Sequence, residues 1–474
     1  MRPLKVAVAT SAAMVAAAGV ALAHPHRREK ARRTARVWRL TTRRSLHWLL
    51  VWVRGRAADE EARARLEERF AIRSAEDVAR ELGGMKGAIM KAGQMLSFLA
   101  DGLPPEAQAA LATLQADVPP MAPSLAEQVV REELGDEPHR LFLDWAPVPV
   151  AAASIGQVHR AVLGDGRLVA VKVQYPGIDR AIRSDLDNLE TYSGVLASVM
   201  LKGLDVKPWV DEIRERMREE VDYRFEADGQ AEFADRYRGH PAIAVPEVVR
   251  ERTARRVLTS EWAEGLTFHQ FLETATEPAR QRAGEAIFRY FMGSIHHYRF
   301  FNGDPHPGNY RFAPDGSVTF LDFGLMKRWE PGELESITPV VDALVAGDAD
   351  RTVTALVDGG FLRADHGLDS ALVFEAAATP YRPLLEPEFT YRRTWVSGAL
   401  ARVLDLQGPY GDVLRAANMP PSYVILDRVV WGMSAILGHL RAHNRWGAIL
   451  AEYREAGPPA TEMGREEAAW RAAT

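Results

Sequence analysis

The chain has 474 residues, 47% of them hydrophobic, and carries a net charge of −5. This length and apolar content suffice for one large domain with extensions. Cysteine is absent, which excludes disulfides, thiolate metal sites and a cysteine nucleophile.

The N-terminal segment, residues 1–56, joins an apolar stretch to a basic flank. Val6–Ala23 has no charged side chain, and the whole segment holds 13 Lys and Arg residues against one acid, Glu29. The mixture of Trp, Arg and Leu after Val37 suits a helix lying at a membrane surface. We expect a membrane anchor or an interfacial helix. A helical tail and a cleavable signal peptide are the open alternatives.

Helical periodicity follows over residues 57–135, where apolar side chains recur at three- and four-residue spacing. The composition changes near residue 147. Two β-rich runs there flank the turn Gly164–Arg167, which predicts a β-hairpin.

A second helical stretch runs from about Asp179 to Tyr237, and two short strands are expected within residues 243–262. Ala263–Phe268 is typical of a linker, and the sequence beyond it is mostly helical. A small β-rich part, a short hinge and a larger helical part are therefore expected.

Three oxygen-bearing side chains interrupt that helical region. Asp304 and Asn309 are five residues apart in a Gly- and Pro-rich loop after a helix expected to end near Phe301, and Asp322 follows an apolar strand. A hairpin would bring the three together. Asn309 and Asp322 would hold Mg²⁺, while Asp304 would orient or deprotonate an attacking hydroxyl or water.

This division of labour is that of phosphoryl transfer. A turn rich in Asp and Asn for backbone reasons is the alternative interpretation. The spacing D-x-x-x-x-N followed by D-F-G favours the metal site.

Lys172 is a predicted partner of this cluster. It lies inside the β-rich run LVAVKVQ, and a lysine on a buried strand is costly unless it is paired. Nucleotide phosphates and a carboxylate, for which Glu226 is the candidate, would pair it. A snorkelling edge-strand lysine is the alternative. The preceding stretch Ala151–Ala161 has one glycine, Gly156, and a run of alanines, whose small side chains permit close backbone approach to phosphate.

Together these motifs resemble the UbiB/AarF family of atypical protein-kinase-like proteins, which is linked to coenzyme Q biology. The resemblance covers about residues 80–330 and rests on MKAGQMLS, AAASIGQVH, VAVK, EEVDYRFEA, GDPHPGN and LDFG. Gly303 is a departure, because the family usually has alanine there.

The resemblance implies a role for each motif. It assigns catalysis to Asp304, Lys172 and Glu226, and the metal to Asn309 and Asp322. Nucleotide contacts would come from Lys172 and the alanine-rich loop, Ala151, Ala152, Ala153, Ser154, Ile155, Gly156 and Gln157. A regulatory K-x-G-Q and E-x-D pair would comprise Lys91, Gly93, Gln94, Glu220 and Asp222, with Lys91 meeting Glu220 or Asp222 in a buried salt bridge.

The implied fold class is α+β: a bilobal protein-kinase-like fold with a small β-rich N-lobe, a large helical C-lobe and a helical N-terminal extension. The expected parts are the N-terminal segment, the extension with the K-x-G-Q motif, the N-lobe and the C-lobe, at residues 1–56, 57–146, 147–265 and 266–474.

The implied function is that of an atypical kinase-like protein using ATP (or ADP) and Mg²⁺, as an ATPase or phosphotransferase linked to isoprenoid quinone or lipid metabolism. We expect it on the cytoplasmic side of a membrane, with a lipid or quinone-like small molecule as partner and no nucleic acid. A soluble cytoplasmic protein is the alternative location. A small-molecule phosphotransferase of the aminoglycoside or choline kinase type, and a non-catalytic nucleotide-gated lipid-binding module, are the alternative functions.

Overall fold

The computed structural model describes residues 121–153, 155–179, 182, 221–405, 407–418 and 420–473. The chain divides into two compact units, Met1–Glu81 and Leu82–Thr474, and every described residue belongs to the second. The predictions for residues 1–56, for most of 57–146 and for Lys91, Gly93, Gln94, Ser154 and Glu220 lie outside the described residues.

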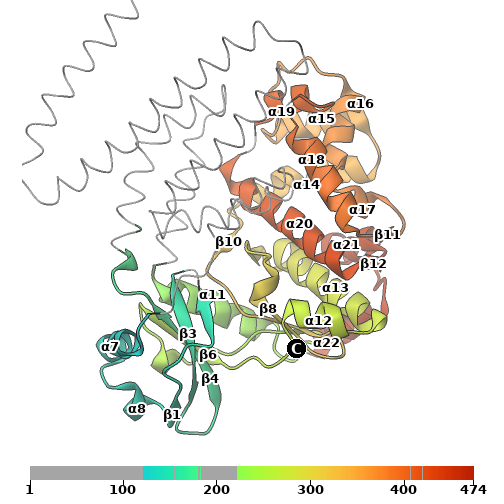
Figure 1. Cartoon of the computed structure of the whole chain (residues 1–474). Coiled ribbons are helices and arrows are strands. Elements are labelled where there is room, and N and C mark those ends of the chain that lie inside the picture. The colour runs from blue at the N-terminus through green and yellow to red at the C-terminus, as the bar shows by residue number, and fades with distance from the viewer. Residues whose placement is uncertain are drawn as a thin grey trace, which may run out of the picture. The chain divides into compact units, whose positions relative to one another are not determined.

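An antiparallel sheet of five strands forms the first described part (Figure 1). Its path is β1-β3-β4-β6, and β2 pairs with β3. The strands are β1 (Asp144–Trp145), β2 (Ala151–Ala153), β3 (Gly156–Val162), β4 (Leu168–Gln174) and β6 (Val257–Glu261). The predicted hairpin is the β3–β4 pair, whose turn uses Gly166 at φ 90°, a conformation that glycine adopts without strain.

Alternation along β4 decides where Lys172 points. Val169, Val171 and Val173 are fully buried and share a hydrophobic cluster with α7 (Pro123–Leu134), which is followed by α8 (Pro138–Leu141). Because successive side chains of a strand point to opposite faces, Lys172 faces away from α7.

Helix α11 (Tyr223–Arg236) carries Glu226, which bonds Lys172, and it contributes to two hydrophobic cores. Its first turn packs Tyr223 and Ala227 with residues of the sheet, whereas Phe233 and Tyr237 belong to the large core of the helical part. The carboxylate of Asp222 caps the helix by accepting a hydrogen bond from the Arg224 amide. Helix α11 therefore packs against the sheet that carries Lys172 at one end and against the helical part that carries the Asp304 and Asp322 loops at the other.

The helical part is built around α13 (Glu277–Met292) and α20 (Pro421–Leu440). Its other helices are α12 (Phe268–Thr274), α14 (Glu333–Val345), α15 (Ala349–Asp358), α16 (Ser370–Ala378), α17 (Arg382–Leu385), α18 (Arg393–Leu404), α19 (Gly411–Ala416), α21 (Trp446–Arg454) and α22 (Glu462–Ala473), with a 3₁₀ turn at Pro307–Asn309. Another 3₁₀ turn, Arg250–Arg252, precedes β6 of the sheet.

The helix expected to end near Phe301 ends earlier. α13 continues as a π-helical segment, η2 (Gly293–Tyr298), and Arg299 then adopts a left-handed conformation with φ 55°. That residue turns the chain into a short strand, β7 (Phe300–Asn302). The expectation was wrong by three residues because backbone geometry at Arg299, rather than the apolar pattern, stops the helix.

Short strand pairs hold the loops that carry the polar cluster. β7 pairs with β10 (Met326–Arg328), and β8 (Tyr310–Phe312) forms the expected hairpin with β9 (Val318–Phe320). β5 (Ile243–Ala244) adds to β9 in parallel, and β11 (Phe389–Thr390) pairs with β12 (His443–Asn444) elsewhere.

Within the described part of the chain, one helical stretch, Ser422–Leu440 of α20, is long and apolar enough to cross a membrane, and 72% of it is buried in the structure. That burial fits a core helix of the helical part.

A buried ion network fixes the C-terminal helix α22 to this core. The fully buried guanidinium of Arg289 bonds Glu285 at 2.7 Å, and Glu452 and Glu467 at 2.9 Å. Burial opposes the charge of Arg289, but these carboxylates raise its pKa above the ordinary value. One cation therefore balances several buried acids contributed by α13, α21 and α22.

Replacing Arg289 with methionine is expected to lower the free energy of unfolding by about 3–5 kcal/mol, because three carboxylates would lose their buried partner. Urea unfolding followed by circular dichroism measures this. Arg471→Met, which removes a more exposed partner of Glu467, is the matched control. Equal losses for the two variants would contradict the central place given to Arg289.

Candidate functional site

Lys172 lies between two carboxylates from different parts of the chain. Its Nζ is 2.8 Å from Glu226 Oε1 and 3.5 Å from Asp322 Oδ2. The Glu226 side chain is 4% exposed, and the Lys172 and Asp322 side chains are 17% and 24% exposed. Nζ also lies 5.0 Å from the ring centroid of Tyr223. The helix carboxylate expected opposite Lys172 is thus in place, and solvent can still reach the lysine and Asp322.

The charge of Lys172 is set by these neighbours. Burial by itself would lower the pKa of the ammonium, but the Asp322 and Glu226 carboxylates outweigh it and hold the pKa well above 10.5. Lys172 is therefore a cation at all physiological pH values.

Asn302 joins the loops of Asp304 and Asp322. Its side-chain amide donates to the Asp322 carbonyl oxygen at 2.5 Å, and its Oδ1 accepts from the Asp304 amide at 2.7 Å. Asn309 Nδ2 lies 3.4 Å from Asp304 Oδ2. Sequence reasoning missed Asn302, the last residue of β7, because its contacts with two backbone groups leave no signal in the residue pattern.

The β8–β9 hairpin brings Asn309 next to Asp322. Tyr310 pairs with Phe320, and one step further the Leu321 amide donates to the Asn309 carbonyl at 2.9 Å. The Gly324 amide orients Asp322 by donating to its Oδ1 at 3.0 Å. The hairpin thus brings the backbone of the two residues together, and an amide oxygen and a carboxylate are ligands that Mg²⁺ uses when phosphate oxygens and water complete its coordination.

Among the described residues, no three His, Asp or Glu side chains gather in a way that could hold a metal. The assignment of Mg²⁺ to Asn309 and Asp322 stays a prediction.

Arg428 of α20 is a buried partner of Asp304 that sequence reasoning missed. Its guanidinium forms an ion pair with Asp304 Oδ1, and its Nε donates to the Gly303 carbonyl at 3.0 Å. Both side chains are at most 10% exposed. An Asp–Arg pair inside the apolar run VILDRVVWGM was the available signal, because charges in a buried helix need a partner.

Two glycines let α20 approach the Asp304 loop. A Cβ added to Gly303 would lie 2.5 Å from Ile425, and one added to Gly432 would lie 2.4 Å from Pro305. At position 303, where the resemblance leads us to expect alanine, this chain has glycine. The Ile425 side chain of α20 fills the space that an alanine methyl group would occupy.

Burial shifts the pKa values of two partly buried side chains of the helical part in opposite directions. Burial lowers the pKa of His296 to about 4 and raises the pKa of Asp427 to about 6. The stability due to neutral His296 is present above pH 6.5 and is lost as pH falls through 4. The stability due to protonated Asp427 is present below pH 3.8 and is lost as pH rises through 6.

In the native chain, the effects of His296 and Asp427 on the free energy of unfolding should cancel between pH 4.5 and 6. The Asp427→Asn variant lacks the titrating carboxyl, so the effect of His296 alone should become measurable. We expect the free energy of unfolding of this variant to fall by about 2 kcal/mol as pH drops from 6.5 to 4.5, while that of the native chain changes little. Denaturant unfolding across this range measures both. If the free energy of unfolding fell equally in the two proteins as the pH drops, the opposite effects assigned to His296 and Asp427 would be wrong.

The alanine-rich loop forms the β2–β3 hairpin beside Lys172. Ala151 and Ala152 are exposed, whereas Ile155 is buried with Tyr223 in a hydrophobic cluster. Gly156 pairs with Gln174, and a Cβ there would lie 2.3 Å from the Val173 carbonyl oxygen. The single glycine of the loop is thus a packing requirement of the sheet.

Gln157 is buried on the sheet. Its Oε1 accepts from the Met121 amide at 2.9 Å, and its Nε2 lies 2.8 Å from His159. These contacts tie the start of α7 to β3, so the described contacts of Gln157 are structural. Its expected nucleotide contact stays a prediction.

Asp222 is engaged by Arg224, whose side chain donates to it at 2.6 and 2.9 Å. These bonds hold the pKa of Asp222 below its usual value. The expected Lys91 partner, with Gly93, Gln94 and Glu220, lies outside the described residues, so the K-x-G-Q and E-x-D contact stays a prediction.

Comparison with known proteins decides the family. Residues 113–356 match the family described as the ABC1 atypical kinase-like domain. The chain belongs to this family. The resemblance to UbiB/AarF proteins is confirmed by this match and by a relative of Arabidopsis thaliana that is named as an aarF domain-containing protein kinase.

Some of the relatives are named as mitochondrial or chloroplastic proteins. Atypical kinase COQ8B, mitochondrial, of Rattus norvegicus is 30% identical over 374 residues, which cover 78% of this chain and 70% of that protein. Protein ACTIVITY OF BC1 COMPLEX KINASE 8, chloroplastic, of Arabidopsis thaliana is 35% identical over 283 residues, covering 58% of this chain and 37% of that protein. The chain spans 39% to 50% of the length of three other relatives from Synechocystis and Arabidopsis.

A solved structure extends the match to most of the chain. It is described as the complex of Rv3197 with erythromycin from Mycobacterium tuberculosis. It is 31% identical with a TM-score of 0.61, and covers 85% of this chain and 100% of that one. The described residues thus form a kinase-like domain of mixed helix and strand content.

Proposed function

We propose that the chain binds Mg-ATP between the sheet and the Asp304–Asp322 loops, as between the two lobes of a kinase, and transfers the γ-phosphate to water or to a small, lipid-like acceptor. The observation that carries this proposal is the position of Lys172, which contacts Glu226 of α11 and Asp322 of the D-F-G loop at once. A cation held there by two carboxylates is placed to meet phosphate oxygens.

Each residue of the site has a distinct task in this proposal. Lys172, held by Glu226, would bind the α- and β-phosphates. Asn309 and Asp322 would hold Mg²⁺, which neutralises charge on the phosphates. Asp304 would orient the attacking hydroxyl or water, and Arg428 would balance the charge of Asp304 and fix its rotamer.

The physiological setting is inferred from the relatives. COQ8B is called an atypical kinase and is mitochondrial, and the Arabidopsis relative is chloroplastic. The UbiB/AarF resemblance links the site to isoprenoid quinone or lipid metabolism. The basic, Trp-containing segment 1–56 supports attachment to an anionic membrane surface.

The test is ATP hydrolysis by the purified full chain, with and without anionic liposomes and quinone-like phenols. The proposal predicts Mg²⁺-dependent turnover that rises when both additions are present. Mg²⁺-dependent nucleotide binding with no turnover under any condition would favour a nucleotide-gated binding module instead. Phosphorylation of soluble amino alcohols or aminoglycosides would favour the small-molecule phosphotransferase.

A further inference from the structure

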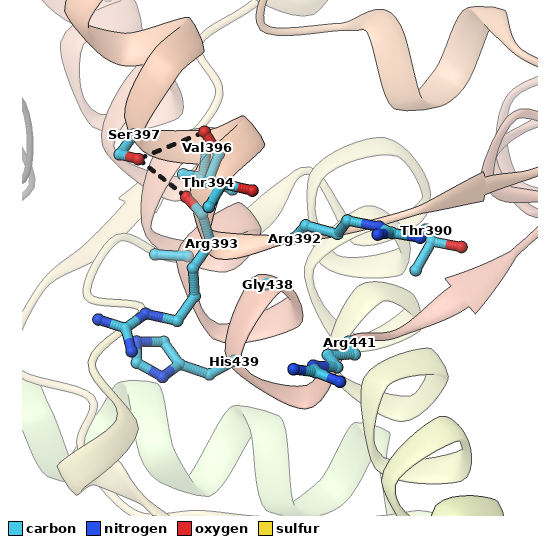
Figure 2. Close-up of a pocket in the computed structure, with 10 residues that line it drawn as sticks. Thr390, Arg392, Arg393, Thr394, Val396, Ser397, Gly438, His439 and Arg441 are labelled. Carbon is cyan, nitrogen blue, oxygen red and sulfur yellow. Dashed lines mark hydrogen bonds between the residues drawn. The ribbon is translucent and has the colours of Figure 1, made fainter.

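A pocket lined by none of the residues assigned to nucleotide opens where α18 begins and α20 ends (Figure 2). Its volume is about 840 Å³, which is in the range of small-molecule sites. The side chains that line it are mostly basic or hydroxyl-bearing: Thr390, Arg392, Arg393, Thr394, Val396, Ser397, Ala435, Gly438, His439 and Arg441.

The fold holds the backbone of these residues in place, and the three arginine side chains are exposed to solvent. Gly438 lets the first turn of α18 approach α20, since a Cβ there would lie 3.2 Å from the Arg393 nitrogen. Just before this turn, Thr390 pairs with His443 in the β11–β12 ladder, and the Tyr391 amide donates to the Ala442 carbonyl at 2.9 Å. The pocket is therefore built from paired backbone rather than from an isolated loop.

The charge in this pocket is not balanced locally. Figure 2 draws Arg393 and His439 on one side and Arg392 and Arg441 on the other. Within the part of the chain that the structure describes, none of these three arginines has a carboxylate within 4.0 Å, although Arg289, Arg428 and Arg454 all do. No side chain caps the N-terminus of α18, but the C-terminus of α20 also lines the pocket. The two helix dipoles oppose each other there, so the positive charge of the pocket comes from its arginine side chains.

We propose that this pocket binds a phosphate-bearing molecule. Guanidinium groups match phosphate oxygens in geometry and charge, and the Thr394 hydroxyl adds a polar group. The Ser397 hydroxyl already donates to the Arg393 and Thr394 carbonyl oxygens. The volume exceeds that of a lone phosphate ion, and Val396 and Ala435 offer apolar contact to the rest of the ligand. The phosphate belongs either to a soluble metabolite or to a lipid headgroup.

The pocket and the Asp304 site contact different parts of α20. Arg428, which pairs with Asp304, and His439, which lines the pocket, are both on α20, and a helix rises 1.5 Å per residue. They are thus separated by about 16 Å along the axis. Ligand binding here is distinguishable from nucleotide binding at Lys172 by mutation.

The test compares two triple variants of the full chain with equal loss of charge. One removes the pocket arginines by Arg392→Gln, Arg393→Gln and Arg441→Gln. The control carries Arg351→Gln, Arg363→Gln and Arg402→Gln, three exposed arginines that do not line the pocket. Thermal unfolding checks that both fold, and ATP affinity checks the Lys172 site.

Two probes identify the source of the phosphate: inorganic pyrophosphate by calorimetry, and phosphatidylcholine vesicles with or without phosphatidate by flotation. We expect the pocket variant to bind at least one probe about tenfold or more weakly, and the control to differ from the native chain by less than about twofold. A selective loss of pyrophosphate indicates a soluble ligand, and a selective loss of phosphatidate vesicles indicates a headgroup. Equal binding of both probes by the two variants would overturn the proposal.

Discussion

Replacement of Lys172 by methionine is expected to weaken Mg-ATP binding by about 10- to 100-fold, the range for a lost charge-assisted bond to phosphate. Methionine keeps much of the packing of the aliphatic stem but removes the cation that Glu226 and Asp322 share. Equilibrium binding of a fluorescent ATP analogue measures the change.

The Lys172→Met substitution should affect both the stability of the fold and the affinity for ATP, so a control must distinguish the two effects. Removing the cation leaves Glu226 buried without its ammonium partner, which itself lowers stability. Lys327→Met is the matched control, because Lys327 is 3.1 Å from Glu333 in a similarly buried pair. The control should lose stability and keep its ATP affinity. ATP affinity unchanged in Lys172→Met would remove Lys172 from the nucleotide site.

Asp304→Asn is expected to lower turnover by about 10²- to 10⁴-fold, the usual contribution of a positioned acid–base group. ATP affinity should change little, because Lys172 and Asp322 remain. The substitution leaves the Arg428 guanidinium buried beside a neutral amide, so the free energy of unfolding should also fall by about 3–5 kcal/mol.

A double-mutant cycle with Arg428→Met separates the two consequences. The single variants should each destabilise the fold, and the double variant should recover much of the loss, since neither charge is left unpaired. Turnover should stay low whenever Asp304 is absent. Recovery of turnover in the double variant would show that Asp304 acts through stability alone.

The sequence specified the local parts of the site better than its long-range contacts. The β3–β4 hairpin was predictable from the turn Gly164–Arg167, and the β8–β9 hairpin from the spacing of Asn309 and Asp322. Both features are short-range, so periodicity and turn residues encode them.

Arg428 and Asn302 escaped prediction for different reasons. Arg428 lies 124 residues from Asp304 in sequence, and its role depends on how closely α20 packs at Gly303 and Gly432. Asn302 acts through two backbone groups, a contact that depends on loop geometry and not on residue pattern. The arginine pocket likewise arises from two helix ends that meet only in the folded chain.

The most direct test of the account is the Mg²⁺ dependence of ATP binding in the native chain and in Asp322→Asn. Oxygen ligands from Asn309 and Asp322 would place the ion against the phosphates that Lys172 binds. Calorimetric titration with and without Mg²⁺ should show a large metal-dependent gain in affinity for the native chain and little or none for the variant. An equal gain in both proteins would contradict the assignment of Asp322 to the metal and, with it, the proposed site.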